Sequence, residues 1–177
     1  MSSLRALLVG TFCVLLGASG LAASDTRSDR AVRHGLALAL FEQACLAKAP
    51  SFRATPAVFQ AMGLVRPHDK TAYRNAEAGL YGGVVPIDAG GILGRQCSVL
   101  LKDGVLPILV VGLRESLVRV AEPDTLLETP PIEANDPVLW DFRLAAIGAV
   151  SVTAGMADQG IAIIGMQVAD RKGLTQR

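Results

Sequence analysis

The chain has 177 residues, of which 17 are Lys or Arg and 16 are Asp or Glu, and 51% of its residues are hydrophobic. A protein this close to neutral has no global field that attracts nucleic acid or an anionic membrane, so we expect neither as a partner. The length suits one domain with a substantial core.

The first 23 residues have the pattern of a secretory signal peptide. Arg5 precedes an apolar run that ends in the small residues of "GASGLAA", as expected of a cleaved leader. We therefore expect residues 1–23 to be removed and residues 24–177 to be periplasmic or secreted, without stable membrane insertion. An uncleaved anchor is the alternative, although Ala6–Ala23 is only 18 residues long, the lower limit for a span.

Two cysteines remain in the predicted mature chain, Cys45 and Cys97. Cys45 shares a helical stripe with Phe41, and Cys97 shares a strand face with Val99. Because an exported chain meets an oxidising compartment, we expect a disulfide that ties a helix to a strand. Two buried free thiols are the alternative. A zinc site lacks the necessary CxxC spacing, and a catalytic thiol is disfavoured at the C-terminal end of a helix.

The N-terminal half predicts two helices. The first covers 30–48 and ends at an Ala-Pro pair, because proline disfavours helix in the residue before it. The second covers 56–62, with Thr55 as its N-cap and Gly63 after its end. Residues 64–75 are expected to form a loop.

The remaining chain predicts strands and one more helix. Residues 77–101 read as two strands around the glycine-rich bend "DAGG", and 106–121 has a helical apolar period despite many β-branched residues. The acidic, Pro-rich segment 122–137 is expected to be a surface loop. Two apolar segments around "AGMADQG" predict an antiparallel hairpin. Together these elements predict a single α+β domain with helices on one face of an antiparallel sheet of about four strands.

Three stretches carry a resemblance to a group of known proteins: "FEQACLA", "TPAVFQAMGL" and "GRQCSVLLKDG". With them the chain resembles small uncharacterised secreted proteins of Gram-negative bacteria, in which a helix cysteine pairs with a strand cysteine. The resemblance covers about half of the predicted mature chain and does not extend beyond residue 121. It implies export and a disulfide, and it brings no activity and no catalytic residues.

The residues that carry chemistry form no recognisable motif. His34 and His68 are the two histidines, and neither has the second His or Cys nearby that a metal site needs. No G-x-S-x-G nucleophile turn occurs. We therefore assign no catalytic residue, no metal and no cofactor, and we consider an enzyme less favoured than a non-enzyme. Carboxylates that converge only in the fold would still permit a hydrolase.

We expect an exported module that binds a small molecule or a protein partner. Tyr81, His68 and Trp140 are the candidate surface residues, although a large aromatic such as Trp140 fits a core equally well. A self-associating envelope protein, for example a homodimer through the C-terminal hairpin, is a further alternative. Gly148→Asp or Ile163→Asp would disrupt such a dimer. An enzyme predicts a polar pocket with His68 or several carboxylates, whereas a binder predicts an apolar pocket or an exposed sheet face.

Overall fold

The computed structural model describes residues 12–68, 70–89, 92–133, 136–145, 147–157 and 160–169, with backbone only for 12–26, 89 and 92. The chain divides into two compact units, Met1–Arg33 and His34–Arg177. Within the described ranges, no helix combines the length and the apolarity that a membrane span requires.

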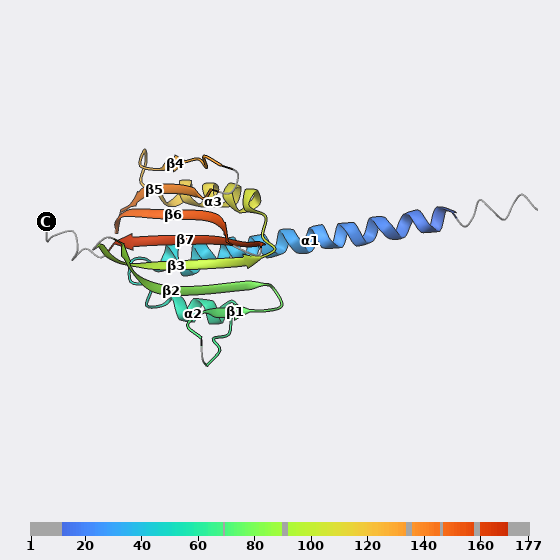
Figure 1. The fold of residues 1–177 in the computed structure, drawn as a ribbon, viewed down its shortest axis with the longest axis horizontal. Coiled ribbons are helices and arrows are strands. Elements are labelled where there is room, and N and C mark those ends of the chain that lie inside the picture. The colour runs from blue at the N-terminus through green and yellow to red at the C-terminus, as the bar shows by residue number, and fades with distance from the viewer. Residues whose placement is uncertain are drawn as a thin grey trace, which may run out of the picture. The chain divides into compact units, whose positions relative to one another are not determined.

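Three α-helices, one 3₁₀ helix and seven strands make up the described chain. The helices are α1 (Phe12–Ala44), η1 (Leu46–Lys48), α2 (Thr55–Ala61) and α3 (Leu106–Val120). The strands are β1 (Tyr73–Asn75), β2 (Leu80–Ala89), β3 (Ile92–Lys102), β4 (Leu127–Thr129), β5 (Val138–Leu144), β6 (Gly148–Ala157) and β7 (Ile161–Ala169). They form one sheet in the order β1-β2-β3-β7-β6-β5-β4, and all neighbours are antiparallel (Figure 1).

The predicted α+β class with an antiparallel sheet is confirmed, but the expectation of about four strands is wrong. Both β1 and β4 have only three residues, which is too short for an alternating pattern to register. They lie in segments that were predicted as loops. The third extra strand, β5, follows directly after the Pro-rich segment. Its alternation of buried and more exposed residues begins before the apolar segments from which the C-terminal hairpin was predicted.

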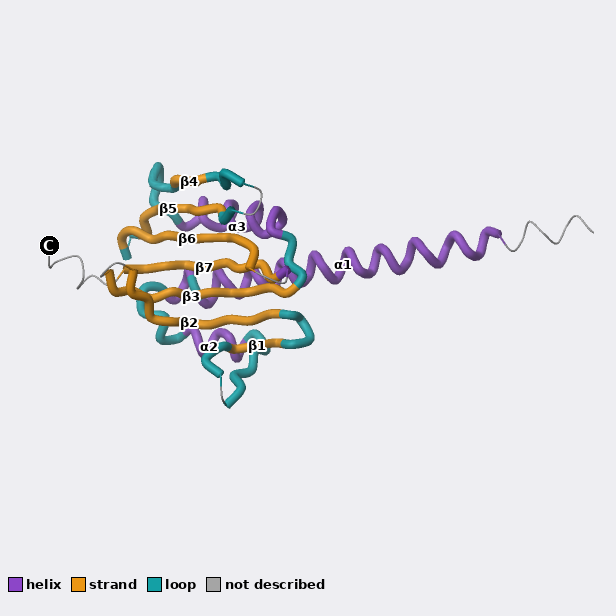
Figure 2. Tube along the Cα trace, in the orientation of Figure 1, coloured by secondary structure: helices purple, strands orange, loops and turns teal. Residues whose placement is uncertain are grey.

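Alternate strand residues and the helices form one core. From His34 onward α1 lies on the same side of the sheet as α2 and α3, as Figure 2 shows. The largest fully buried side chains come from both layers, among them Phe41 of α1, Leu113 of α3, Trp140 of β5 and Ile164 of β7. At about 25 cal/mol per Å² of apolar surface, this burial is the main stabilising contribution to the fold.

The predicted disulfide between Cys45 and Cys97 is confirmed, with a Cα–Cα distance of 5.5 Å. Both cysteines are fully buried, and they join the C-terminal end of α1 to β3. Thr55, predicted as a cap, is instead the first residue of α2, and no side chain caps the preceding Ala54. The Thr55 hydroxyl donates a hydrogen bond to the Ala44 carbonyl at 2.6 Å, so it satisfies the end of α1.

The other helix and hairpin predictions are confirmed at their centres. The predicted helix 106–121 is α3, and the predicted C-terminal hairpin is the β6–β7 pair. Gly63 ends α2 with φ of 80°, and Leu64 N–H donates to the Phe59 carbonyl as in a Schellman motif.

Some predictions fall outside the described residues. The predicted leader is described only as helical backbone from Phe12, so its cleavage stays a prediction. Gly90 and Gly91 of the predicted bend also lie outside the described residues.

Candidate functional site

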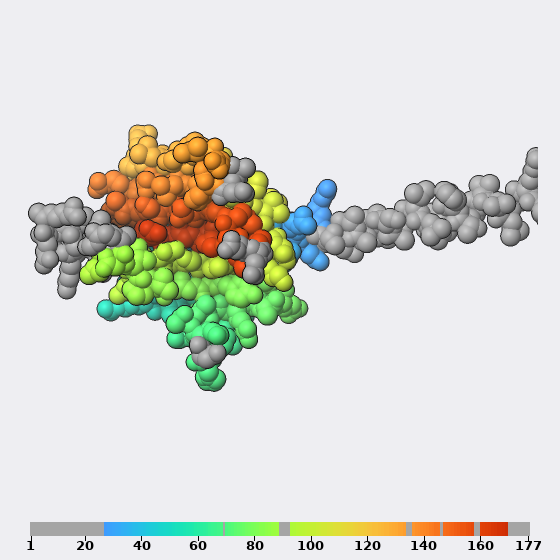
Figure 3. All heavy atoms as spheres, viewed as in Figure 1, coloured from blue at the N-terminus to red at the C-terminus, as the bar shows by residue number. Residues whose placement is uncertain are grey.

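The face of the sheet that points away from the helices has no described element over it (Figure 3). We call it the outer face: the odd-numbered positions of β2, β5, β6 and β7 and the even-numbered positions of β3, which alternate with the buried positions. Figure 3 views the molecule from this side, and the strand atoms are in direct view with no described helix over them.

The outer face carries few charges. Among its described side chains, only Lys102, Asp141 and Arg143 are charged. An antiparallel sheet with one solvated face usually alternates apolar-in and polar-out. Here Val85, on the outer face of β2, has an exposed fraction of 44%. The outer face is therefore less polar than a solvated sheet face normally is.

Two neighbouring rows of residues run across the strands of the outer face and differ in side-chain size. Tyr81, Leu100 and Ile163 lie side by side on β2, β3 and β7 and form an apolar row that we call the ridge. The next row contains Gly83, Ser98 and Gly165, which we call the furrow because two of its three residues have no side chain.

The furrow is open at one end and lined by polar groups at the other. A Cβ placed on Gly83 would meet nothing within 4 Å. A Cβ placed on Gly165 would lie 3.1 Å from the Gln96 amide nitrogen and 3.6 Å from the Ser98 hydroxyl. The Gln96 amide in turn donates to Ser98 Oγ at 3.1 Å. The furrow can therefore accept an apolar group at Gly83 and hydrogen-bond a polar one near Gly165.

A hollow of about 380 Å³ lies beyond the furrow, at the end of the sheet where β7 finishes. It is lined by Ile87, Gly94, Asp141, Phe142, Ala149, Val150, Ser151, Gln167 and Ala169. The Ser151 hydroxyl donates to Asp141 Oδ1 at 2.5 Å. A Cβ on Gly94 would lie 2.6 Å from the Val168 carbonyl oxygen. Only glycine therefore lets β3 and β7 approach this closely, and the missing side chain deepens the hollow.

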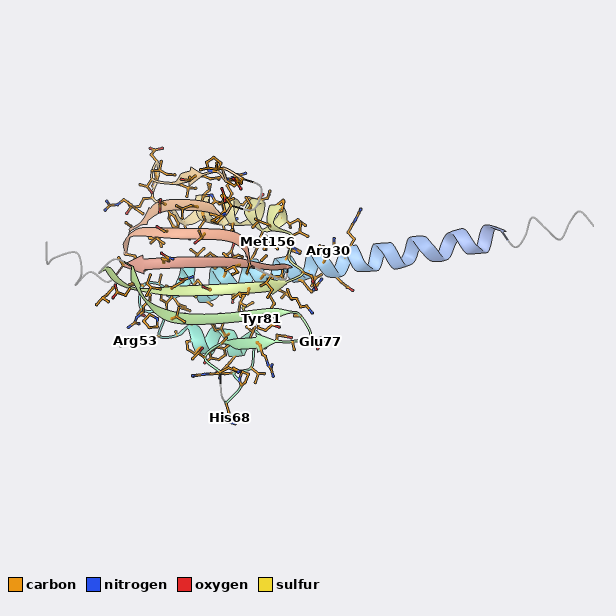
Figure 4. All side chains as sticks on the ribbon, in the orientation of Figure 1. Arg30, Arg53, His68, Glu77, Tyr81 and Met156 are labelled. Atoms are coloured by element: carbon orange, nitrogen blue, oxygen red, sulfur yellow. A yellow bond between two sulfur atoms is a disulfide. The ribbon has the colours of Figure 1, made fainter. Side chains whose placement is uncertain are left out.

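The three residues predicted for a ligand or partner surface do not come together. Tyr81 lies on the outer face, whereas His68 lies exposed at the tip of the loop between α2 and β1, away from Tyr81 (Figure 4). Trp140 has an exposed fraction of 0% on the helix-covered face, so it belongs to the core and contributes nothing to a surface.

Trp140 instead ties an edge strand to the core. Its indole N–H donates to Glu128 Oε2 at 2.8 Å, and Arg114 of α3 binds the same carboxylate through two donors, at 2.7 and 2.5 Å. The hydrogen bonds from Arg114 lower the pKa of Glu128, more than its partial burial raises it. The same contact raises the pKa of Arg114. This cluster stabilises the position of β4.

A second, smaller cavity of about 170 Å³ lies between α1 and α3. The buried Ser116 hydroxyl donates to Glu42 there, and Arg119 pairs with the same carboxylate at 2.9 Å. No histidine lines either cavity: His34 is buried elsewhere, where its Nε2 accepts the Val105 N–H at 2.8 Å. Each cavity has a single carboxylate among its lining residues, and that carboxylate accepts a hydrogen bond from a serine hydroxyl. Neither cavity therefore has the paired acids of a glycoside hydrolase.

The described part of the chain holds no group of three or more His, Cys, Asp or Glu side chains suited to a metal ion.

The ridge and furrow were missed from sequence because their members lie far apart in the chain: Gly83 and Ser98 are 15 positions apart, and Ser98 and Gly165 are 67 positions apart. Strand alternation around Ser98 and Leu100 was visible, but only the register brings the rows together. No protein-family model, no curated protein and no solved structure gives a significant match to this chain.

Proposed function

We propose that this protein is an exported binding module that takes its partner on the outer face of the sheet. The observation that carries the proposal is the ridge and furrow on a wide, charge-poor surface that no described element covers. Charge depletion at the centre with polar groups around it is typical of recognition surfaces. The ridge adds half-buried apolar side chains to this surface.

Export is part of the same proposal and is supported by two features. The N-terminal 23 residues follow the signal-peptide pattern, and the Cys45–Cys97 disulfide suits an oxidising compartment.

Native mass spectrometry of protein taken from the periplasm or medium of its own organism tests the proposal. We expect a denatured mass that begins near Ser24, and a native mass that includes a bound species. Gly83→Arg should remove that species, because a Cβ at this position meets nothing within 4 Å and the arginine side chain would fill the open end of the furrow.

Gly35→Arg is the matched control. Gly35 is exposed on α1 and a Cβ there also meets nothing within 4 Å, so the same charge and bulk are added away from the outer face. Retention of the bound species in Gly83→Arg, or its equal loss in both variants, would overturn the assignment to the outer face. A denatured mass that includes residues 1–23 would overturn export by a cleaved leader.

A further inference from the structure

We infer that the hollow at the end of the sheet binds a small organic amine, with its protonated amino group at Asp141 and its apolar part against Ile87. The inference goes beyond the proposed function, because it does not depend on the ridge and the furrow and it names the chemical class of a ligand. The polar groups, the shape and the charge of the hollow each support it.

The polar side of the hollow is a row of three neighbouring residues. Asp141 of β5 pairs with Ser151 of β6, and Ser151 pairs with Gln167 of β7. The other residues that line the hollow are apolar or glycine. A concave site that is mostly apolar and has a few polar groups is the usual form of a small-molecule site.

Small residues form the floor beside this row. Gly94 of β3 pairs with Ala169 of β7, and Ala149 of β6 lies two residues, about 7 Å, from Ser151. Ile87 of β2 pairs with Gly94 and bounds the floor on that side. The volume of about 380 Å³ is near the lower limit for ligand sites. The hollow therefore suits a small molecule whose apolar part lies on these residues.

The charge of the hollow favours a cation. Among the described residues that line it, only Asp141 is charged. The ion pairs in the described part of the chain involve other carboxylates, those of Glu42, Glu122 and Glu128. Arg143 lies two residues from Asp141 on β5, but its Nε pairs with Glu122 Oε2 at 3.4 Å. The Asp141 carboxylate would therefore attract a positively charged ligand group and repel an anion.

The hydrogen-bonding groups of the row favour a ligand that donates. The Ser151 hydroxyl donates its single hydrogen to Asp141 Oδ1, so its oxygen is left as an acceptor. An ionised aspartate has acceptors only, and the Gln167 amide adds a carbonyl oxygen. A primary ammonium group has three N–H donors and one positive charge. It matches both the acceptors and the charge of this row.

The cavity between α1 and α3 provides a comparison. It is smaller, at about 170 Å³, and its carboxylate already has a cation. Glu42 pairs with Arg119 at 2.9 Å and accepts a hydrogen bond from Ser116. An amine would have to displace Arg119 from this cavity, so the hollow at Asp141 is the better site for a cationic ligand.

Titration of the purified, disulfide-bonded protein with n-pentylamine, followed by amide chemical shifts in NMR spectra, tests the inference. The amine is protonated at neutral pH. We expect the Ser151 and Gln167 amides to shift, with a dissociation constant of about a millimolar. 1-Pentanol has the same chain without the charge and should bind at least about tenfold more weakly. Pentanoate should not bind, and added salt should weaken the binding of the amine.

Asp141→Asn removes the charge and keeps the side-chain shape. It should weaken pentylamine binding at least about tenfold and leave pentanol binding unchanged. Asp103→Asn is the matched control, because Asp103 is exposed directly after β3 and its φ of 56° is one that asparagine also adopts. Ala149→Leu should abolish the binding of both probes, because it fills the hollow from an exposed position.

A lysine side chain of a protein partner carries the same ammonium group as a free amine. Nα-acetyl-lysine N-methylamide distinguishes these two sources. We expect it to bind more weakly than pentylamine, because its two amide groups would lose water against the apolar floor. Tighter binding of the lysine derivative would overturn the small amine as the ligand.

Two results would overturn the amine site. One is equal binding of pentylamine and pentanol, and the other is equal binding of pentylamine to the wild type and to Asp141→Asn. Neither affects the proposed function, whose test is the species that Gly83→Arg removes, because Gly83 does not line the hollow. Conversely, retention of that species in Gly83→Arg would overturn the proposed function, while pentylamine binding that requires Asp141 would still support the amine site.

Discussion

The two faces of the sheet are formed by the same strands but differ in burial. On the inner face, alternate residues such as Val99, Trp140 and Met166 are buried under three helices, and a disulfide joins the layers. On the outer face, their strand neighbours Ser98, Leu139 and Gln167 have no described element over them. The inner face carries the stability of the fold, and the outer face is the surface that we propose for recognition.

The difference lies in side-chain size as well as in polarity. Large residues fill the inner face, whereas glycine, serine and threonine occupy the middle of the outer face at Gly83, Ser98, Thr153 and Gly165. A core of such small residues would leave cavities. On an uncovered surface these small residues create a depression, which a partner of complementary shape can fill.

The largest loss of stability on the inner face should come from removal of the disulfide between α1 and β3. Replacing both Cys45 and Cys97 by alanine should lower the free energy of unfolding by about 4 kcal/mol, because the disulfide closes a long loop in the unfolded chain. The separation is 52 residues. Urea unfolding of the double variant measures this loss, and reduction of the wild type provides the control. Unchanged stability in both would show that packing alone holds α1 to the sheet.

Two adjacent isoleucines separate the faces directly. Ile164 has an exposed fraction of 1%, and its neighbour Ile163 lies on the outer face. Ile164→Ala should cost about 3 kcal/mol by leaving a cavity, whereas Ile163→Ala should cost about 1 kcal/mol or less in the monomer. Urea unfolding at low protein concentration compares them. Equal costs would mean that the outer face is covered in solution.

Ile163 and Ile164 also show how much of the fold could be predicted from the sequence. The apolar run "IAIIGMQV" predicts a strand, but adjacent isoleucines do not reveal which one points inward, and a slip of one residue exchanges the faces. Trp140 was ambiguous because a large aromatic fits a core as well as a surface. The disulfide was predictable because Cys45 and Cys97 each lie on an apolar face of a recognisable element. The ridge and furrow were not, because they depend on the order of strands in the sheet.

A polar contact of the inner layer should have an intermediate effect. Thr55→Val keeps the side-chain volume but leaves the Ala44 carbonyl without the hydroxyl that donates to it. Loss of a buried hydrogen-bond partner costs about 1–3 kcal/mol. Thr153→Val is the matched change on the outer face and should alter monomer stability by less than about 0.5 kcal/mol. A Thr55 variant as stable as the wild type in urea would mean that another group satisfies the carbonyl.

The smallest effect should come from the edge of the sheet, where Glu128 connects β4 to Arg114 and Trp140. The hydrogen bonds from Arg114 lower the pKa of Glu128 in the folded protein. Its carboxylate therefore stabilises the fold fully above the ordinary glutamate pKa of about 4.3. That contribution falls as the pH decreases from this value and is lost below the lowered pKa of the folded state.

Glu128→Gln removes this pH dependence while it keeps an acceptor for the Trp140 indole. We expect the wild type to be slightly more stable than Glu128→Gln at pH 7, and the two to converge as the pH falls below about 4. Because the pair is exposed, the difference should be small and should shrink in high salt. Thermal unfolding between pH 7 and pH 3 measures both curves. A constant difference at every pH would show that Glu128 acts through packing, and that the edge of the sheet, like its inner face, is held without charge.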